Sequence, residues 1–188
     1  MTRSSWRPLV LTLAASLLLT ACSASASTRV ASPSSEPSAA SSRSQVPALS
    51  GPDTLTYAGV TVSGRLGAEP RFLIGDETQQ TASTQVRDVV VGTGPVATAA
   101  DRVTVNYTAR GARSKRTFDS SWLRGRPFSF VPSKIAFTAF SSGVPGMRVG
   151  GRRLVVVPGP LAFAARPPAG SGLAANETVV FVIDLVSV

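Results

Sequence analysis

The sequence contains no histidine and one cysteine, Cys22, in 188 residues. Without imidazole groups and a second thiol, the chain lacks the ligand sets that hold zinc in proteins, and a thiol or imidazole nucleophile system is excluded. No glycine-rich phosphate loop follows a strand and opens a helix. We therefore expect neither a metal nor a cofactor. One cysteine also allows no intramolecular disulfide, so the folded domain depends on its core for stability.

A long apolar run is also missing near the N-terminus. The apolar segment from Leu9 to Leu19 has about eleven residues, whereas a transmembrane helix needs roughly 20. It follows Arg3 and Arg7, and a basic region before a short apolar region is typical of a secretory signal peptide.

The residues Leu19 to Cys22 resemble the bacterial lipobox, in which the cysteine is acylated at its thiol and begins the mature protein. We predict a lipoprotein signal peptide over residues 1–21 and lipidation of Cys22, which places the protein outside the cytoplasm and anchors it to the cell membrane. Two acyl chains suffice for stable anchoring, since each buried CH₂ contributes about 0.8 kcal/mol. The alternative is an ordinary secretory signal in which Cys22 is incidental.

Acidic residues are scarce, with 10 Asp and Glu against 19 Lys and Arg. Removing Arg3 and Arg7 with the signal leaves 17 basic and 10 acidic residues, a charge of +7. Export makes nucleic acid unavailable as a partner, so none is expected. Anionic lipid or wall polymer is accessible to such a surface, and the simpler alternative is that arginine only solubilises it.

Hydrophobic periodicity is absent from residues 23–52, which hold 11 serines among 30 residues together with alanine and proline. Such a segment buries too little surface to offset its ordering entropy. Residues 22–54 are therefore predicted to be the acylated cysteine and a flexible tether with a reach of about 30 Å.

Strand signals begin near Leu55. Residues 55–62 and 71–74 are predicted as two strands of a β extension over residues 55–85, either packed on a main sheet or forming an edge hairpin. Alternation and β-branched runs predict a main domain over residues 86–188. Its expected elements are strands at 86–91, 103–108, 116–121, 127–131, 152–157 and 179–188, and one short helix at 138–143.

Six motifs occur in order within this main domain. They are VNYT (105–108), FDSS (118–121), RGRPFSF (124–130), GVPGMRVGGRR (143–153), Pro158 with LAF (161–163), and Val180-Phe181. In this order and spacing they resemble the FKBP-type peptidyl-prolyl isomerases over about 100 residues. The resemblance implies an α+β fold, an FKBP-like half-barrel in which an antiparallel sheet of five or six strands curls around one short helix.

The resemblance also implies an apolar pocket between the helix and the sheet. The catalytic positions fall on Tyr107, Phe118, Asp119 and Phe163, and the substrate-binding positions fall on Phe128, Ala136, Phe137, Phe140, Phe181 and Arg124, which pairs with Asp119. Phe130 is instead expected to point into a different layer of packing.

Four positions depart from the pattern of the family. Phe140 replaces a tryptophan at the pocket floor, Phe163 replaces a loop tyrosine, Ala164 replaces the glycine after it, and Ser141-Ser142 replace two acidic residues. We expect a deeper floor, unless Phe137 refills it, and the loss of one hydrogen bond to a bound peptide or macrolide carbonyl, worth about 0.5–1.5 kcal/mol.

Catalysis in such a pocket needs no nucleophile, metal or proton donor. The X–Pro bond has a rotation barrier of about 18–20 kcal/mol, and an aromatic socket that strips water from the amide favours the twisted, less polarised form. The sequence predicts a prolyl isomerase that assists the folding of proline-containing exported proteins, with a macrolide as a possible ligand. A catalytically weak chaperone or peptide-binding module is the alternative, and a surface adhesin or envelope spacer is a third hypothesis.

Overall fold

The computed structural model describes residues 54–188. The predicted signal peptide, Cys22 and nearly all of the tether lie outside the described residues. Within residues 54–188, no helix is long and apolar enough to cross a membrane.

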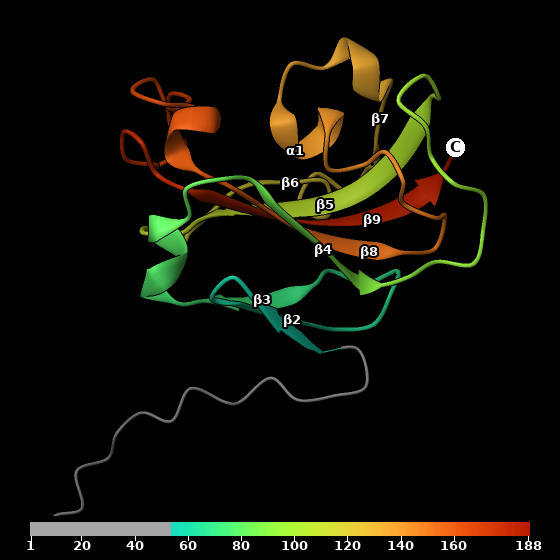
Figure 1. Cartoon of the computed structure of the whole chain (residues 1–188), viewed down its shortest axis with the longest axis horizontal. Coiled ribbons are helices and arrows are strands. Elements are labelled where there is room, and N and C mark those ends of the chain that lie inside the picture. The colour runs from blue at the N-terminus through green and yellow to red at the C-terminus, as the bar shows by residue number, and fades with distance from the viewer. Residues whose placement is uncertain (1–53) are drawn as a thin grey trace, which may run out of the picture. The chain divides into compact units, whose positions relative to one another are not determined.

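A six-stranded antiparallel sheet forms the main domain, with the order β4-β8-β9-β5-β6 and with β7 also paired to β5. Its strands are β4 (Gln85–Val90), β5 (Val103–Gly111), β6 (Thr117–Ser120), β7 (Phe128–Phe130), β8 (Arg152–Val157) and β9 (Val179–Ser187). Each of the six strands predicted over residues 86–188 is present, with ends shifted by a few residues. Figure 1 shows β5, β9 and β8 running side by side across the molecule.

The short helix α1 (Thr138–Ser141) lies against one face of this sheet, which we call the inner face (Figure 1). The predicted core side chains on this face are buried: Val103, Val105 and Tyr107 on β5, and Phe181, Ile183 and Leu185 on β9. The 3₁₀ turn η2 (Pro132–Lys134) precedes α1. At the end of α1, a Cβ atom at Gly143 would lie 2.1 Å from the Ala139 carbonyl oxygen, so the chain can leave the helix here only through glycine.

Residues 54–84 form a second sheet of three antiparallel strands in the order β1-β2-β3. The strands are β1 (Leu55–Tyr57), β2 (Val60–Ser63) and β3 (Arg71–Ile74), followed by the 3₁₀ helix η1 (Asp76–Gln80). The prediction of one strand over residues 55–62 is wrong, because Ala58 and Gly59 adopt φ values of 49° and 74° and close a hairpin between β1 and β2. Alanine is disfavoured in this left-handed region, so the sequence carries only a weak turn signal there.

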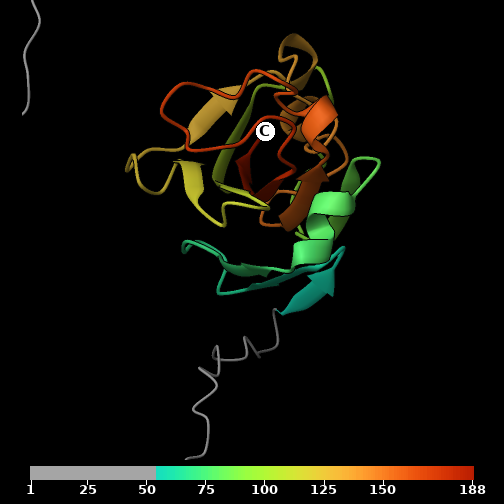
Figure 2. The ribbon, with the colours of Figure 1, turned by 90° about the vertical axis from the view of Figure 1, so that its left-hand side faces the viewer.

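The three-stranded sheet packs on the outer face of the main sheet, and Figure 2 shows it in teal beneath the main sheet. Its buried side chains contact the outward-facing residues of β8 and β9: the cluster comprises Val60, Val62, Phe72, Leu154, Val156, Val180 and Val182. Of the two alternatives for this extension, packing on the main sheet is the one observed. All six residues of β8 are buried, which explains why its last four residues, Leu154 to Val157, are all apolar and show no alternation with polar residues.

A buried, ion-paired arginine of the main sheet connects the two sheets at one end of this contact. The Arg152 guanidinium is fully buried and donates to both carboxylate oxygens of Asp184 at 2.6 Å. It also donates to the carbonyl oxygens of Gly64, Arg65 and Ala68 in the loop between β2 and β3, at 2.8 to 3.2 Å. Five hydrogen bonds therefore compensate the desolvation of this arginine.

Candidate functional site: an aromatic pocket on the inner face

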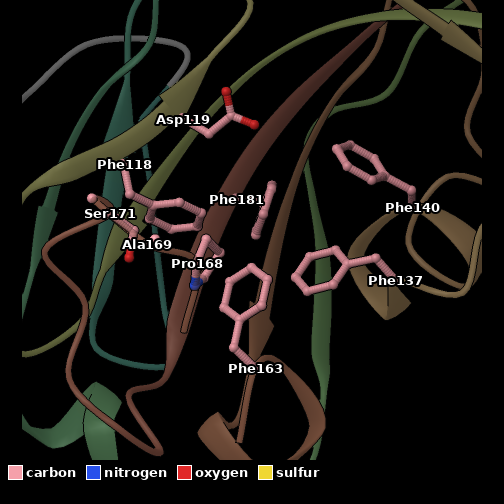
Figure 3. Close-up of a pocket in the computed structure, with 10 residues that line it drawn as sticks. Phe118, Asp119, Phe137, Phe140, Phe163, Pro168, Ala169, Ser171 and Phe181 are labelled. Atoms are coloured by element: carbon pink, nitrogen blue, oxygen red, sulfur yellow. The ribbon is translucent and has the colours of Figure 1, made fainter. Parts of the chain in front are cut away.

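A pocket of about 530 Å³ opens between α1, the inner face of the main sheet and the loop that precedes β9 (Figure 3). Its lining is mostly aromatic and contains one charged residue, Asp119. The lining residues are Phe118, Asp119, Phe137, Phe140, Phe163, Pro168, Ala169, Gly170, Ser171 and Phe181.

Phe181 on β9 forms the base of an aromatic ring cluster, and Figure 3 shows the rings of Phe118, Phe137 and Phe163 grouped around it. The Phe181 ring lies 5.9 Å from Phe118 and 5.4 Å from Phe137, centroid to centroid. Phe163 stacks on Phe137 at 5.1 Å and meets Phe118 edge to face at 5.9 Å. Aromatic pairs prefer these offset and edge-to-face geometries, so the four rings form firm, apolar walls.

Two consecutive residues of β6, Phe118 and Asp119, both line the pocket. Strict alternation along a strand would place them on opposite faces. The pairing of β6 with β5 shifts here, since Ala109 pairs with Asp119 but Arg110 pairs with Thr117. This bulge leaves Phe118 unpaired, and bulges are known to re-aim side chains near functional sites.

Asp119 belongs to a polar group with Tyr107 and Arg124 at the edge of the aromatic cluster. The Tyr107 hydroxyl donates to Asp119 Oδ2 at 2.5 Å, and Arg124 Nη2 donates to the Tyr107 hydroxyl oxygen at 2.9 Å. Arg124 also forms an ion pair with Asp119. Burial and the hydrogen bond to Asp119 raise the pKa of Tyr107 to about 12, so the phenol remains a proton donor in its hydrogen bond at neutral pH.

Ser121 forms hydrogen bonds with the backbone of Tyr107. Its hydroxyl oxygen accepts from the Tyr107 N–H at 2.9 Å, and its own N–H donates to the Tyr107 carbonyl at 2.9 Å. The serine belongs to the FDSS motif, but the sequence alone predicts no role for it. Its place opposite Tyr107 depends on strand pairing.

Phe140, on α1, lines the pocket and also packs into the aromatic core. Its ring is 5.1 Å from Tyr107, 5.5 Å from Phe128 and 5.1 Å from Phe130. Phe128 and Phe130 stack on each other at 5.0 Å within this same core. The prediction that Phe130 points into another layer of packing is therefore wrong, because residues two apart on β7 share one face.

The structure brings together most of the predicted site residues. Eight are placed as pocket lining or in the polar group with Asp119: Phe118, Asp119, Phe137, Phe140, Phe163, Phe181, Tyr107 and Arg124. Phe128 packs against the Tyr107 ring. Ala136 is exposed and does not line the pocket, so the structure does not support its predicted contact with substrate. Phe137, the residue before α1, occupies the wall in its place.

One wall of the pocket was not predicted. Pro168 to Ser171 come from a loop whose proline, alanine and glycine content has no periodicity, so only the folded path of the chain reveals its contact with the pocket. Buried Glu177 fixes this loop, since its carboxylate accepts the N–H groups of Ala174, Arg113 and Ser114 at 2.6 to 3.0 Å. Burial of Glu177 opposes ionisation, but these N–H donors outweigh it and lower the pKa of the carboxyl.

Ala164, directly after Phe163, adopts a left-handed conformation with φ of 48°. Its N–H donates to the Gly159 carbonyl at 2.8 Å, and its own carbonyl accepts the Asn176 N–H at 2.7 Å. The loop therefore keeps a conformation suited to the glycine of the family pattern, although alanine occupies it.

Comparison with known proteins agrees with this fold. The family model for FKBP-type peptidyl-prolyl cis-trans isomerases matches residues 94–186. The FK506-binding protein of Streptomyces anulatus is 39% identical over 108 residues, which cover 57% of this chain and 87% of the relative. The probable FK506-binding protein of Corynebacterium glutamicum is 38% identical over 103 residues, which cover 54% of this chain and 84% of the relative.

Solved structures have the same architecture. The crystal structure of AtFKBP13 matches with a TM-score of 0.50 at 25% identity, over 55% of this chain and 91% of that chain. The N-terminal domain of FKBP42 from Arabidopsis thaliana matches with a TM-score of 0.51 at 19% identity, over 57% and 87% of the two chains, and supports the fold alone. The chain belongs to the FKBP-type peptidyl-prolyl cis-trans isomerase family, and its antiparallel sheet with a short helix has the FKBP-like fold.

Proposed function

We propose that the aromatic pocket on the inner face is the site of peptidyl-prolyl isomerisation, and that the protein assists the folding of exported proteins. The observation that carries this proposal is the cluster formed by Phe118, Phe137, Phe163 and Phe181, with Asp119 on the same pocket wall. A proline ring is compact and apolar, and it fits a firm aromatic socket of this kind.

The proposed mechanism follows from the polarity of the pocket. The planar X–Pro amide is stabilised by charge separation between its nitrogen and oxygen, and the twisted amide at the top of the barrier has less of this separation. Walls of phenylalanine solvate the planar form poorly, which lowers the cost of twisting relative to water. In this mechanism Asp119 orients the Tyr107 hydroxyl and transfers no proton.

A protease-coupled assay on an X–Pro tetrapeptide tests this mechanism in the purified protein. We expect acceleration above the thermal rate, with both Phe118→Ala and Asp119→Ala reducing it at least tenfold, which is about 1.4 kcal/mol of barrier. Asp101→Ala is the matched control, because Asp101 caps a surface turn through the Thr98 N–H and should leave the rate unchanged. Circular dichroism verifies that each variant is folded.

Three results, from this assay and from a parallel measurement of the aggregation of an unfolded client, would count against the proposal. Unchanged rates in both pocket variants would mean that catalysis occurs elsewhere. No acceleration by the unaltered protein, combined with suppressed aggregation of an unfolded client, would favour the catalytically weak chaperone. Neither effect would favour an adhesin or spacer.

Macrolide binding is a further part of the proposal, and two relatives have names that include FK506 binding. The loop aromatic here is Phe163, which has no hydroxyl to donate to a ligand carbonyl. We expect weaker binding by about 0.5–1.5 kcal/mol than a tyrosine would give. Inhibition of the same assay by FK506, in the unaltered protein and in Phe163→Tyr, measures this difference.

Export and lipid anchoring through Cys22 also belong to the proposal. They rest on Arg3 and Arg7, the apolar segment after them and the lipobox-like residues before Cys22. Incorporation of labelled palmitate into the membrane fraction, and its loss in Cys22→Ser, would support acylation. An unlabelled protein in the culture medium would favour the ordinary secretory signal.

A further inference from the structure

The charges around the pocket mouth are unbalanced. Asp119 is the one acidic residue in the lining, and it is already engaged by Arg124 and the Tyr107 hydroxyl. Two arginines lie close to the lining in sequence: Arg116 lies two residues before Phe118, and Arg166 lies three residues after Phe163. A substrate that enters the pocket therefore meets arginine charge that no carboxylate of the lining neutralises.

Arg116 has a defined place at this mouth. Its guanidinium atoms lie 3.7 to 3.9 Å from the position of a Cβ atom at Gly172, the residue after the lining residue Ser171. The side chain thus lies between the start of β6 and the loop that forms one pocket wall. Its own backbone is held there, since the Arg116 carbonyl accepts the Gly111 N–H at 3.1 Å.

The Arg116 guanidinium is also available for a ligand. The residue is exposed, and among residues 54–188 its side chain has neither an ion pair nor a hydrogen bond. Arg124 differs in this respect, because its donors are taken by Asp119 and Tyr107. Arg166 is likewise exposed, and its backbone N–H donates to the Phe163 carbonyl at 2.9 Å. Its charge adds positive potential to the same region.

We propose that Arg116 is a specificity-determining residue that binds a carboxylate of the substrate, so that proline-containing segments with Asp or Glu next to the proline are preferred. This inference rests on the proposed function of the pocket. With the proline ring among the aromatic side chains, the flanking residues must cross the rim on which Arg116 lies. Guanidinium and carboxylate form paired hydrogen bonds, and an exposed pair of this kind corresponds to a preference of roughly two- to fivefold.

Matched peptides test this preference. We would measure kcat/KM for tetrapeptides that differ only in Glu or Gln before the proline, and for a second pair that differs only in Glu or Gln after it. We expect the Glu peptide to be favoured roughly two- to fivefold in at least one pair. The ratio should approach one in ~1 M salt, because the screening length then falls to about 3 Å.

Three variants assign the preference to Arg116. Arg116→Gln should bring the ratio of kcat/KM for the Glu and Gln peptides close to one. Arg116→Glu should reverse the charge preference, so that the Gln peptide is favoured over the Glu peptide and a matched Lys peptide is favoured over the Gln peptide. Arg71→Gln is the matched control, since Arg71 is an exposed arginine on β3, on the far side of the main sheet, and should keep the original ratio. A purely structural role for Arg116 would not produce a reversal.

Equal kcat/KM for Glu and Gln peptides in both pairs would overturn the inference, as would a preference that survives in Arg116→Gln. In those two cases measurable turnover of the Gln peptides leaves the proposed isomerase function in place. No acceleration of any peptide would overturn the isomerase function and this inference together.

Discussion

The two faces of the main sheet are formed by alternate residues of the same strands, but they pack against different kinds of side chain. On β9, Phe181, Ile183 and Leu185 point to the inner face, while Val180 and Val182 point to the outer face. The inner face meets aromatic rings that touch edge to face and leave a pocket of about 530 Å³. The outer face meets a second sheet through a buried cluster that is mostly valine and leucine and contains one phenylalanine, Phe72.

This difference indicates that the shape of the aromatic rings determines where a pocket remains in the packed structure. Phenylalanine rings are flat and rigid, so a cluster with 5 to 6 Å between centroids can surround space without filling it. Valine and leucine pack into one another's gaps. The outer face should therefore determine stability and the inner face should determine function, and the four predictions below test that division.

The largest effect is expected from deleting residues 54–84. The deletion exposes Leu154, Val156, Val180 and Val182, each worth about 1.5–3 kcal/mol when buried, and uncovers the buried Arg152. We expect loss of the cooperative thermal transition and aggregation in size-exclusion chromatography.

Leu73→Ala is the control for this deletion, because Leu73 is an exposed apolar residue of the same sheet and should change stability little. If the protein without residues 54–84 is monomeric and keeps its melting temperature, the main sheet does not need the second sheet on its outer face for stability.

Arg152→Ala is expected to cost about 3–5 kcal/mol, because it leaves the Asp184 carboxylate buried without its partner. The carbonyl oxygens of Gly64, Arg65 and Ala68 lose their donor as well. Urea denaturation measures the loss, and the folded fraction should retain isomerase activity because the pair lies on the outer face.

Arg102→Ala is the matched control, an exposed arginine with no ion pair among residues 54–188. A cost for Arg152→Ala no larger than that of the control would mean that the buried pair contributes nothing.

Glu177 gives the inner face a pH dependence. Because its pKa is lowered in the folded protein, its contribution to stability is present above the unfolded value, about 4.5, and is lost as pH falls through the folded value. Glu177→Gln should cost about 1.5–3 kcal/mol at pH 7, since hydrogen bonds to a charged acceptor are replaced by weaker ones.

Urea denaturation at pH 7 and pH 3 measures both effects. The difference in stability between Glu177 and its Gln variant should shrink at pH 3. A constant difference at both pH values would contradict the assignment of the pH dependence to this carboxyl.

The smallest effect is expected at Ala164. The left-handed φ of 48° costs an alanine about 1–2 kcal/mol, whereas glycine costs about 0.4–1 kcal/mol through the unfolded chain. Ala164→Gly should therefore be neutral or stabilising by up to about 1.6 kcal/mol. Ala165→Gly is the matched control, because Ala165 has no positive φ, and it should be destabilising. Equal melting temperatures for the two variants would indicate that Ala164 is unstrained.

Much of the main domain could be predicted from its sequence. The β-branched run at Arg152–Val157 and the alternation from Val103 onward carry local signals that survive in the structure. The motifs around Phe118 and Phe163 identified most of the pocket wall, because these residues are read from order and spacing.

Other features had no local signal. The hairpin turn at Ala58-Gly59 uses an alanine in a conformation that alanine disfavours. The exposure of Ala136 depends on the path of the chain before α1, whereas alternation along β7 already indicates that Phe128 and Phe130 share one face. The wall formed by Pro168 to Ser171 depends on Glu177, which accepts the N–H groups of Arg113 and Ser114 from a distant part of the chain, and the composition of the loop does not reveal these bonds.

By itself, the sequence determined the family, most of the strands of the main sheet and the aromatic side chains available for a pocket, because strand propensity, alternation and motif order are properties of neighbouring residues. Only the tertiary structure decided that residues 54–84 cover the outer face, that Pro168 to Ser171 form a wall of the pocket, and that Arg116 lies beside the loop that forms this wall. Those outcomes depend on contacts between segments far apart in the chain, where burial and hydrogen bonding override local preference.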